Sequence, residues 1–320
     1  MEDKQYYHFK KKCSRPSVET SSELFYVCSE DARWDDVMRQ FAAFLDSCGY
    51  VGVYERVCLR RHYRMKILVI PDCQVKPGVA TDHLTWAGKA IVDYRPDVVI
   101  NIGDFADMPS LSTHDKAGSK YFEGKRYKDD VNCVKVAMKK LLKPLRDLQA
   151  TQKVTKHKVY KPRMVLTMGN HENRINRAVA NTPMLEGVIS TDDLDYKKDW
   201  DVYDFLKPVF INGVGFCHYF PVGAMGRPAS SASVIVNKLH MSCVAGHQQG
   251  KQVAYGKRAD GTAICGIIAG SYYLHDEDYM DQLSNTHWRG LVMLNEVKDG
   301  AFDEMFLSMN YLQKKYADDT

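Results

Sequence analysis

From residue 65 onward, apolar runs typical of strands alternate with segments whose apolar residues recur at helical spacing. The first run, MKILVI at 65–70, is apolar at nearly every position, which predicts a strand covered on both faces of its sheet. The elements that follow are expected to be a helix at about 81–94, a strand in 97–103, a long helix at about 127–150, a strand in 163–169 and a helix from about 171.

The second half of the chain carries turn signals typical of hairpins. Asn212-Gly213, Asp260-Gly261 and Asp299-Gly300 each lie between two apolar stretches. A helix at about 231–240 and a strand in 241–247 separate the first hairpin from the second. Strand–helix alternation followed by late hairpins predicts an α/β fold with an antiparallel portion.

Residues 1–64 differ from the rest of the chain. They begin with a basic, polar stretch, and the segment 31–49 then predicts one amphipathic helix that ends at Gly49. Its apolar positions at helical spacing are Trp34, Val37, Met38, Phe41, Phe44 and Leu45. We therefore expect an accessory segment at 1–64 and a catalytic domain at 65–320.

Composition changes this picture little. The 320 residues are 45% hydrophobic and 26% charged, with a formal net charge of +4, which permits an anionic substrate without requiring nucleic acid. The nine cysteines form no C-x-x-C pair, and the N-terminus has no apolar core of a signal peptide. No apolar run is long enough to span a membrane. These features predict a cytoplasmic protein with reduced thiols and no membrane partner.

Polar side chains gather just after the predicted strands. Because ligands of open α/β sheets bind at the carboxyl ends of strands, these residues are expected to meet at one site. Carboxylates, amides and imidazoles supply the oxygen and nitrogen donors that divalent cations prefer. The residues concerned are Asp72, Gln74, Asp104, Asp107, Asn170, His171, Glu172, His218, His247 and Gln249.

The order of these residues resembles the calcineurin-like metallophosphoesterase superfamily, whose pattern is D-x-H, G-D-x-x-D, G-N-H-[ED], H and G-H-x-H. The match covers about 65–310, and the motifs are specific jointly rather than singly. The resemblance implies a sandwich of two mixed β-sheets flanked by helices. The loop 109–127 and the segment WRGLVMLN also look like a phage-encoded branch of metallophosphatases and DNA-repair-exonuclease-like proteins; a phage-encoded protein would act in the host cytoplasm.

The resemblance implies roles for individual residues. Asp72 would bind metal one, and Asp104 would bridge both metals. Metal two would be completed by Asn170, His218 and His247. His171 would act on the leaving group, and Asp107 would orient it.

Two residues depart from the family pattern, because Gln74 and Gln249 stand where the family usually has histidine. Both belong to metal one, whose ligands would then all be oxygens, so we expect Mn²⁺ or Mg²⁺ there in preference to Zn²⁺ or Fe. D-x-Q is similar to the manganese-dependent ADP-ribose/CDP-alcohol diphosphatases, although those keep the final histidine. A solvated loop amide is the alternative for each glutamine.

The expected reaction is phosphoester hydrolysis by a metal-bound water held between two divalent cations. Arg174 on the helix after His171, and Lys125 and Arg126 in a basic loop interleaved with aromatic residues, are candidate phosphate contacts. A solvated helical face and a solvated loop are the alternatives. Glu172 is expected to be a first-turn acid that complements the helix dipole.

The leading hypothesis is therefore a metal-dependent phosphoesterase acting on nucleic acid or a nucleotide. A second possibility is a manganese-dependent pyrophosphatase of nucleoside-diphosphate-linked substrates, suggested by D-x-Q. A third is a catalytically weak protein that binds nucleic acid or a partner. The combination of Asn170, His171 and Asp107 argues against the third, because a binder has no need of a leaving-group acid.

Overall fold

The computed structural model describes residues 8–11, 50–53, 64–113, 123–276 and 287–317. The chain divides into two compact units, 1–63 and 64–320. In the first, β1 (His8–Lys11) pairs antiparallel with β2 (Tyr50–Val53). The amphipathic helix expected at 31–49 lies outside the described residues.

The second unit contains a mixed six-stranded sheet. Strands β3 to β6 run parallel to one another, and β12 pairs antiparallel with both β3 and β13. The strands in spatial order are β13 (Ala301–Ser308), β12 (Gly290–Lys298), β3 (Met65–Ile70), β4 (Val98–Asn101), β5 (Arg163–Thr167) and β6 (Asp201–Tyr203).

A mixed five-stranded sheet faces the first. Strands β8, β9 and β11 are parallel, whereas β7 and β10 are its antiparallel edges. The spatial order is β10 (Lys251–Lys257), β11 (Ala263–Ala269), β9 (Cys243–Ala245), β8 (Val214–Cys217) and β7 (Val209–Ile211). The three expected hairpins are all present, as β7–β8, β10–β11 and β12–β13.

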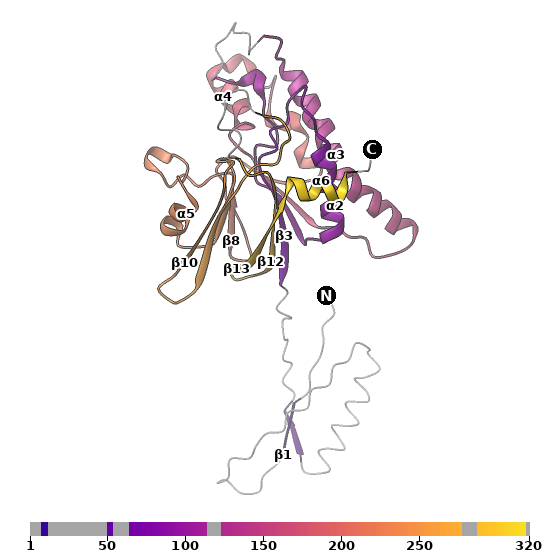
Figure 1. Cartoon of the computed structure of the whole chain (residues 1–320), viewed down its shortest axis with the longest axis vertical. Helices are drawn as coiled ribbons and strands as arrows, with labels where there is room; N and C mark the ends of the chain where they lie inside the picture. Colours follow the sequence, from indigo (N-terminus) through magenta and orange to yellow (C-terminus); the bar gives the residue numbers. More distant parts are fainter. Residues whose placement is uncertain (1–7, 12–49, 54–63, 114–122, 277–286, 318–320) are drawn as a thin grey trace. The chain divides into compact units, whose positions relative to one another are not determined.

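Helices cover the outer faces of both sheets (Figure 1). The six-stranded sheet carries α2 (Asp82–Tyr94), α3 (Tyr127–Val154) and α6 (Met309–Tyr316), and the five-stranded sheet carries α5 (Ala232–Leu239). A shorter helix, α4 (Asn173–Asn181), follows β5. No helix in the described part of the chain combines the length and the apolar character needed to cross a bilayer.

Strand β3 explains why its sequence is apolar at every position. Ile67 and Val69 face the core between the two sheets, whereas Leu68 and Ile70 face the core under α2 and α3. Alternate residues of a strand point to opposite faces, so a strand between two cores needs apolar residues throughout. The expected α/β sandwich of two mixed sheets flanked by helices is confirmed. The three-residue strand β6 and the helix α6 were not among the elements expected from the sequence.

Candidate metal centre

The loops that leave β3, β4, β5, β8 and β9 bring the expected ligands together. Asp104, His218 and His247 each offer one ligand atom within 4.8 Å of the others, the only such group of three among the described residues. Asp104 Oδ2 lies 3.2 Å from His218 Nε2. These residues follow three different strands, so the cluster is a product of the fold and not of local sequence.

Asn170 and Asp72 extend this cluster. Asn170 Oδ1 lies 2.9 Å from His218 Nε2. Asp72 is fully buried, and its Oδ1 accepts a hydrogen bond from the backbone N–H of His247 at 3.1 Å. The structure therefore groups the acid, amide and imidazole side chains that the sequence nominated for metal two, with Asp72 beside them.

The backbone is strained at this centre. Four of the expected ligands have φ between 45° and 68°, a region that non-glycine residues rarely adopt. Each such residue costs on the order of 1–3 kcal/mol, and clusters of them are typical of functional sites. The four are Gln74, Asp104, His247 and Gln249.

Two glycines allow the loops to approach one another closely. A Cβ on Gly169 would lie 2.0 Å from Asp104 Oδ1, and one on Gly246 would lie 2.5 Å from Asp72 Oδ1. Any side chain at either position would displace a carboxylate of the cluster. The glycines of the G-N-H-E and G-H motifs are thus required by the packing of the centre.

The two glutamines are buried, in different surroundings. Neither amide atom of Gln74 has a hydrogen-bond partner among the described residues, although its backbone N–H donates to Asp104 O at 2.8 Å. Gln249 Oε1 accepts from the Tyr273 hydroxyl at 2.9 Å, and that hydroxyl also lies 2.8 Å from His287 Nδ1. Neither glutamine is a solvated loop amide, which was the alternative for both.

His171 and Asp107 form a pair beside the cluster. His171 Nδ1 lies 2.6 Å from Asp107 Oδ1, and its Nε2 faces Asp104 Oδ2 at 3.7 Å. Burial alone would raise the pKa of Asp107. The hydrogen bond with His171 and the charges of Lys76 and Arg174 outweigh this effect and lower the pKa to about 2. Asp107 therefore remains a carboxylate that fixes the ring of His171.

Arg174 is buried behind this pair. Its Nη1 donates to the backbone oxygen of Asp107 at 2.8 Å and to Asp107 Oδ1 at 3.2 Å, and its Nη2 lies 3.4 Å from His171 Nε2. Lys76, which the sequence reading did not single out, lies 3.4 Å from Asp107 Oδ2. Protein acceptors thus take up Nη1 of Arg174, and the side chain is not part of a solvated helical face.

Lys125 and Arg126 lie where α3 begins. Arg126 Nη1 donates to the backbone oxygen of Lys125 at 2.9 Å. In the first turn of α3, Asp130 accepts a hydrogen bond from Ser110 N, in the turn that follows Asp107. Part of the basic loop with its aromatic residues, 114–122, lies outside the described residues.

Glu172 has a different role from the one expected. It is fully buried, and its carboxylate accepts backbone N–H groups from Asp104 at 3.0 Å, Ala106 at 2.9 Å and Gly169 at 2.9 Å. Its Oε1 also accepts from the Tyr196 hydroxyl at 3.4 Å. Glu172 therefore ties the loop after β4 to the loop after β5, instead of simply complementing a helix dipole.

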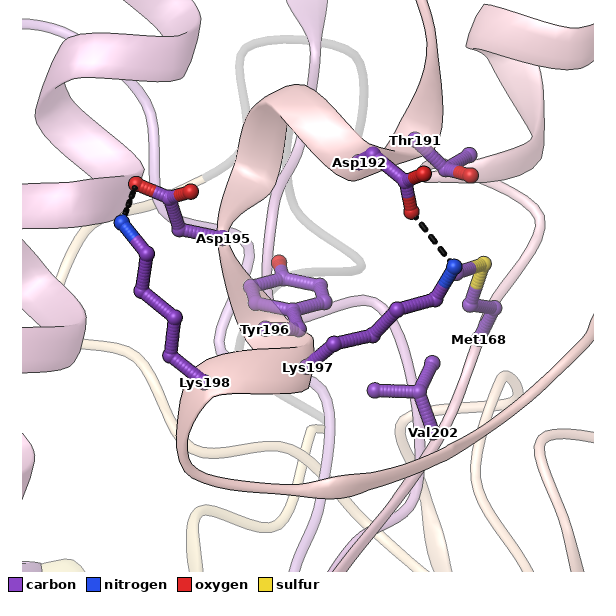
Figure 2. A pocket seen from close by; sticks show the side chains of 8 residues that line it. All are labelled: Met168, Thr191, Asp192, Asp195, Tyr196, Lys197, Lys198 and Val202. Atoms are coloured by element: carbon purple, nitrogen blue, oxygen red, sulfur yellow. Dashed lines mark ion pairs between the residues drawn. The ribbon is translucent and has the colours of Figure 1, made fainter.

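A cavity of about 120 Å³ is lined in part by Tyr196 (Figure 2). It is lined by Met168 and by the short helices η3 (Thr191–Leu194) and η4 (Tyr196–Lys198). An ion pair between Lys197 and Asp192 lies across it. None of the expected ligands lines this cavity, so it is separate from the metal centre.

The donor set fits divalent cations. Asp72 Oδ2 and both amide atoms of Gln74 are buried without hydrogen-bond partners among the described residues, which is unfavourable unless another group binds them. In addition, burial and the charge of Asp104 raise the pKa of Asp72 to about 7, so a cation bound beside this carboxylate would stabilise its charged form. The orphaned atoms and the Asp104 cluster together form a cradle for metal ions.

The surroundings of His218 favour its protonated form. His218 Nδ1 lies 3.1 Å from the Ile102 carbonyl oxygen and so donates to it, which leaves Nε2 facing Asn170 and Asp104. Burial lowers the pKa of His218, but the Asp104 carboxylate raises it more strongly, to about 9. At neutral pH Nε2 therefore carries a proton that a metal ion must displace.

We predict that binding of Mn²⁺ at pH 7 releases between one and two protons, from His218 and in part from Asp72. Because both groups must be deprotonated to bind metal, the dissociation constant should fall as the pH rises from 6 towards 9. Calorimetric titration in two buffers of different ionisation enthalpy measures the released protons. A binding enthalpy that is the same in both buffers at pH 7 would contradict this assignment.

Comparisons with known proteins agree with this geometry. Residues 65–262, more than half of the chain, match the family model described as calcineurin-like phosphoesterase. A search of curated protein sequences gives no significant match.

Several solved structures match the chain at low sequence identity and low TM-score. A predicted phosphoesterase from Streptococcus pneumoniae has 12% identity and a TM-score of 0.32, with 77% of this chain and 90% of that chain covered. The phosphoesterase YfcE from E. coli has 11% identity and a TM-score of 0.32, with 76% and 100% covered. A mutant of Vps29 from Entamoeba histolytica has 11% identity and a TM-score of 0.31, with the same coverage. On the family match and the cluster at Asp104, the chain belongs to the calcineurin-like phosphoesterase family and is a metal-dependent hydrolase of phosphoester bonds.

Proposed function

We propose that the chain hydrolyses a phosphodiester or phosphomonoester of a nucleic acid or nucleotide at a dinuclear centre bridged by Asp104. The observation that carries this proposal is the position of the His171–Asp107 pair beside the cluster of Asp104, His218 and His247. A metal cluster alone serves binding as well as catalysis. A histidine at the edge of the metal cluster, with its ring oriented by a carboxylate, can also donate the proton that a leaving group requires.

The ligands divide between two ions. Asn170, His218 and His247 would hold metal two, and Asp72, Gln74 and Gln249 would hold metal one, with Asp104 shared. Metal one then has oxygen donors throughout, which favours Mn²⁺, with Mg²⁺ next, over Zn²⁺ or Fe. The bound cations supply Lewis-acid stabilisation of the phosphoryl oxygens and lower the pKa of water.

The protein's own groups act around these ions. Asp107 holds His171 Nδ1, so that the ring presents Nε2 to the cluster, where it can donate a proton to the departing oxygen. Burial lowers the pKa of His171, but Asp104 and the hydrogen bond with Asp107 leave it above its usual value. This upward shift favours the protonated ring that the transfer requires.

Basic residues support an anionic substrate. Lys76 lies against Asp107 of this pair, and Lys125 and Arg126 immediately precede α3, whose first turn accepts a hydrogen bond from Ser110 through Asp130. The resemblance of loop 109–127 to phage-type metallophosphatases and exonuclease-like proteins favours nucleic acid or nucleotides as the source of the phosphoester. The pyrophosphatase alternative keeps the same centre and differs only in the group that leaves.

Hydrolysis of bis-p-nitrophenyl phosphate by the full chain with added Mn²⁺ tests this function. We expect turnover that a chelator abolishes and that Mn²⁺ restores. Absence of Mn²⁺-dependent turnover by the unaltered protein would overturn the proposal and favour the binding alternative.

A further inference from the structure

We propose that Tyr219 is a stacking platform for a nucleobase of the substrate, on the side of the centre away from His171. This inference rests on the proposed function and specifies its substrate: a phosphoester whose retained phosphoryl group carries a nucleoside. Two features of the described residues lead to it.

The first feature is the position of the ring. Tyr219 directly follows His218, and its ring centroid lies 4.9 Å from that of His247 at an interplanar angle of 45°. The distance to the ring of His218 is 5.9 Å. The phenol thus borders both imidazoles of metal two, within reach of any group attached to a phosphate bound there.

The second feature is that the core does not need this residue. Its neighbours Cys217 and Phe220 are buried in the cluster beneath α5, whereas Tyr219 is half-buried and belongs to none of the hydrophobic clusters of the described residues. Phe205 supports the ring edge-on, with centroids 5.5 Å apart at 80°. Tyr219 is therefore held in place from the side while part of its surface remains open.

The two sides of the centre differ in chemistry. Asp107 and Arg174 contact the ring of His171, and Lys76 contacts Asp107, so this side is charged. The ring of His247 instead borders the aromatic ring of Tyr219. A leaving group that accepts a proton from His171 therefore departs on the charged side of the centre. The part of the substrate that stays on the phosphorus then lies against Tyr219.

A pair of esters with one leaving group tests this assignment. Thymidine 5′-(p-nitrophenyl phosphate) and methyl p-nitrophenyl phosphate differ only in the retained group. In Tyr219→Leu we expect kcat/KM with Mn²⁺ to fall roughly tenfold for the thymidine ester and less than twofold for the methyl ester. Tyr219→Phe keeps the ring and should retain the preference of the unaltered protein.

Binding measurements separate this inference from the proposed function. Thymidine 5′-monophosphate and methyl phosphate are titrated calorimetrically into the Mn²⁺-loaded proteins, where we expect Tyr219→Leu to weaken only the nucleotide, roughly tenfold. If the unaltered protein shows no turnover but binds the nucleotide more tightly than methyl phosphate in a way that depends on Tyr219, only the proposed function would be overturned. Equal losses for both ligands in Tyr219→Leu, or no loss, would overturn the stacking role whether or not the protein is active.

Discussion

Replacing His171 by alanine is expected to lower kcat by about 10²–10⁴-fold on a phosphoester with an alkyl alcohol as leaving group. An alkoxide is a strong base, so its departure depends on the proton that His171 Nε2 supplies. The hydrogen bond between His171 Nδ1 and Asp107, at 2.6 Å, fixes the ring for this transfer. Steady-state rates with saturating Mn²⁺ measure the loss.

A p-nitrophenyl ester serves as the internal control, because p-nitrophenolate leaves with little need of a proton. The loss in His171→Ala should therefore be smaller by at least an order of magnitude on this ester. The matched variant His157→Ala, which alters an exposed histidine, should change neither rate. Equal losses of His171→Ala on the two esters would show that the residue does not act on the leaving group.

The second large effect is expected from Glu172→Gln. The carboxylate accepts three backbone N–H groups, from Asp104, Ala106 and Gly169. An amide can turn only one oxygen towards them, so at least one buried N–H loses its partner. We expect the free energy of unfolding of the metal-free protein to fall by about 1–3 kcal/mol.

Urea unfolding of the metal-free protein measures this change. Glu186→Gln, which alters an exposed glutamate in the same way, provides the matched control and should change stability by less than about 0.5 kcal/mol. Because Glu172 positions the backbone of Asp104, Mn²⁺ binding should weaken as well. Unchanged stability and unchanged Mn²⁺ affinity in Glu172→Gln would show that these loops are held by other contacts.

Local sequence patterns were sufficient for most of the fold. The unbroken apolar run of β3, the turn signals at Asn212-Gly213, Asp260-Gly261 and Asp299-Gly300, and the helical periodicity of α2 and α3 each depend on neighbouring residues, which a sequence displays directly. Strand β6 was not foreseen, because three residues are too few to show alternation. The clustering of Asp104, His218 and His247 followed from their places after strands.

Contacts between distant residues could not be predicted in this way. Glu172 binds backbone groups more than sixty residues away in sequence, and nothing in its local pattern distinguishes this role from that of a first-turn acid. For Arg174 likewise, the sequence left a phosphate contact and a solvated helical face as alternatives, and it did not indicate the hydrogen bond to the Asp107 backbone oxygen. A buried charge is located by its partners, and those partners are defined only once the chain has folded.

At Gln74 and Gln249 the type of donor atom could be predicted from the sequence, whereas the contacts of each side chain could not. The family pattern laid over the sequence predicts that metal one lacks imidazole donors. It gave no sign that the Tyr273 hydroxyl would hold the Gln249 amide, or that the Gln74 amide would be buried without a hydrogen-bond partner among the described residues. The chemistry of the donors was visible in the sequence, whereas their second contacts were a property of the structure.

A metal titration of the chelator-treated protein tests the account most directly. We predict that Mn²⁺ binds at two equivalents with unequal affinity, the weaker site being the one with glutamine ligands, and that Asp104→Asn weakens both sites because its carboxylate is shared. Two equivalents of tightly held zinc, or Mn²⁺ binding that Asp104→Asn leaves unchanged, would contradict a manganese centre bridged by Asp104.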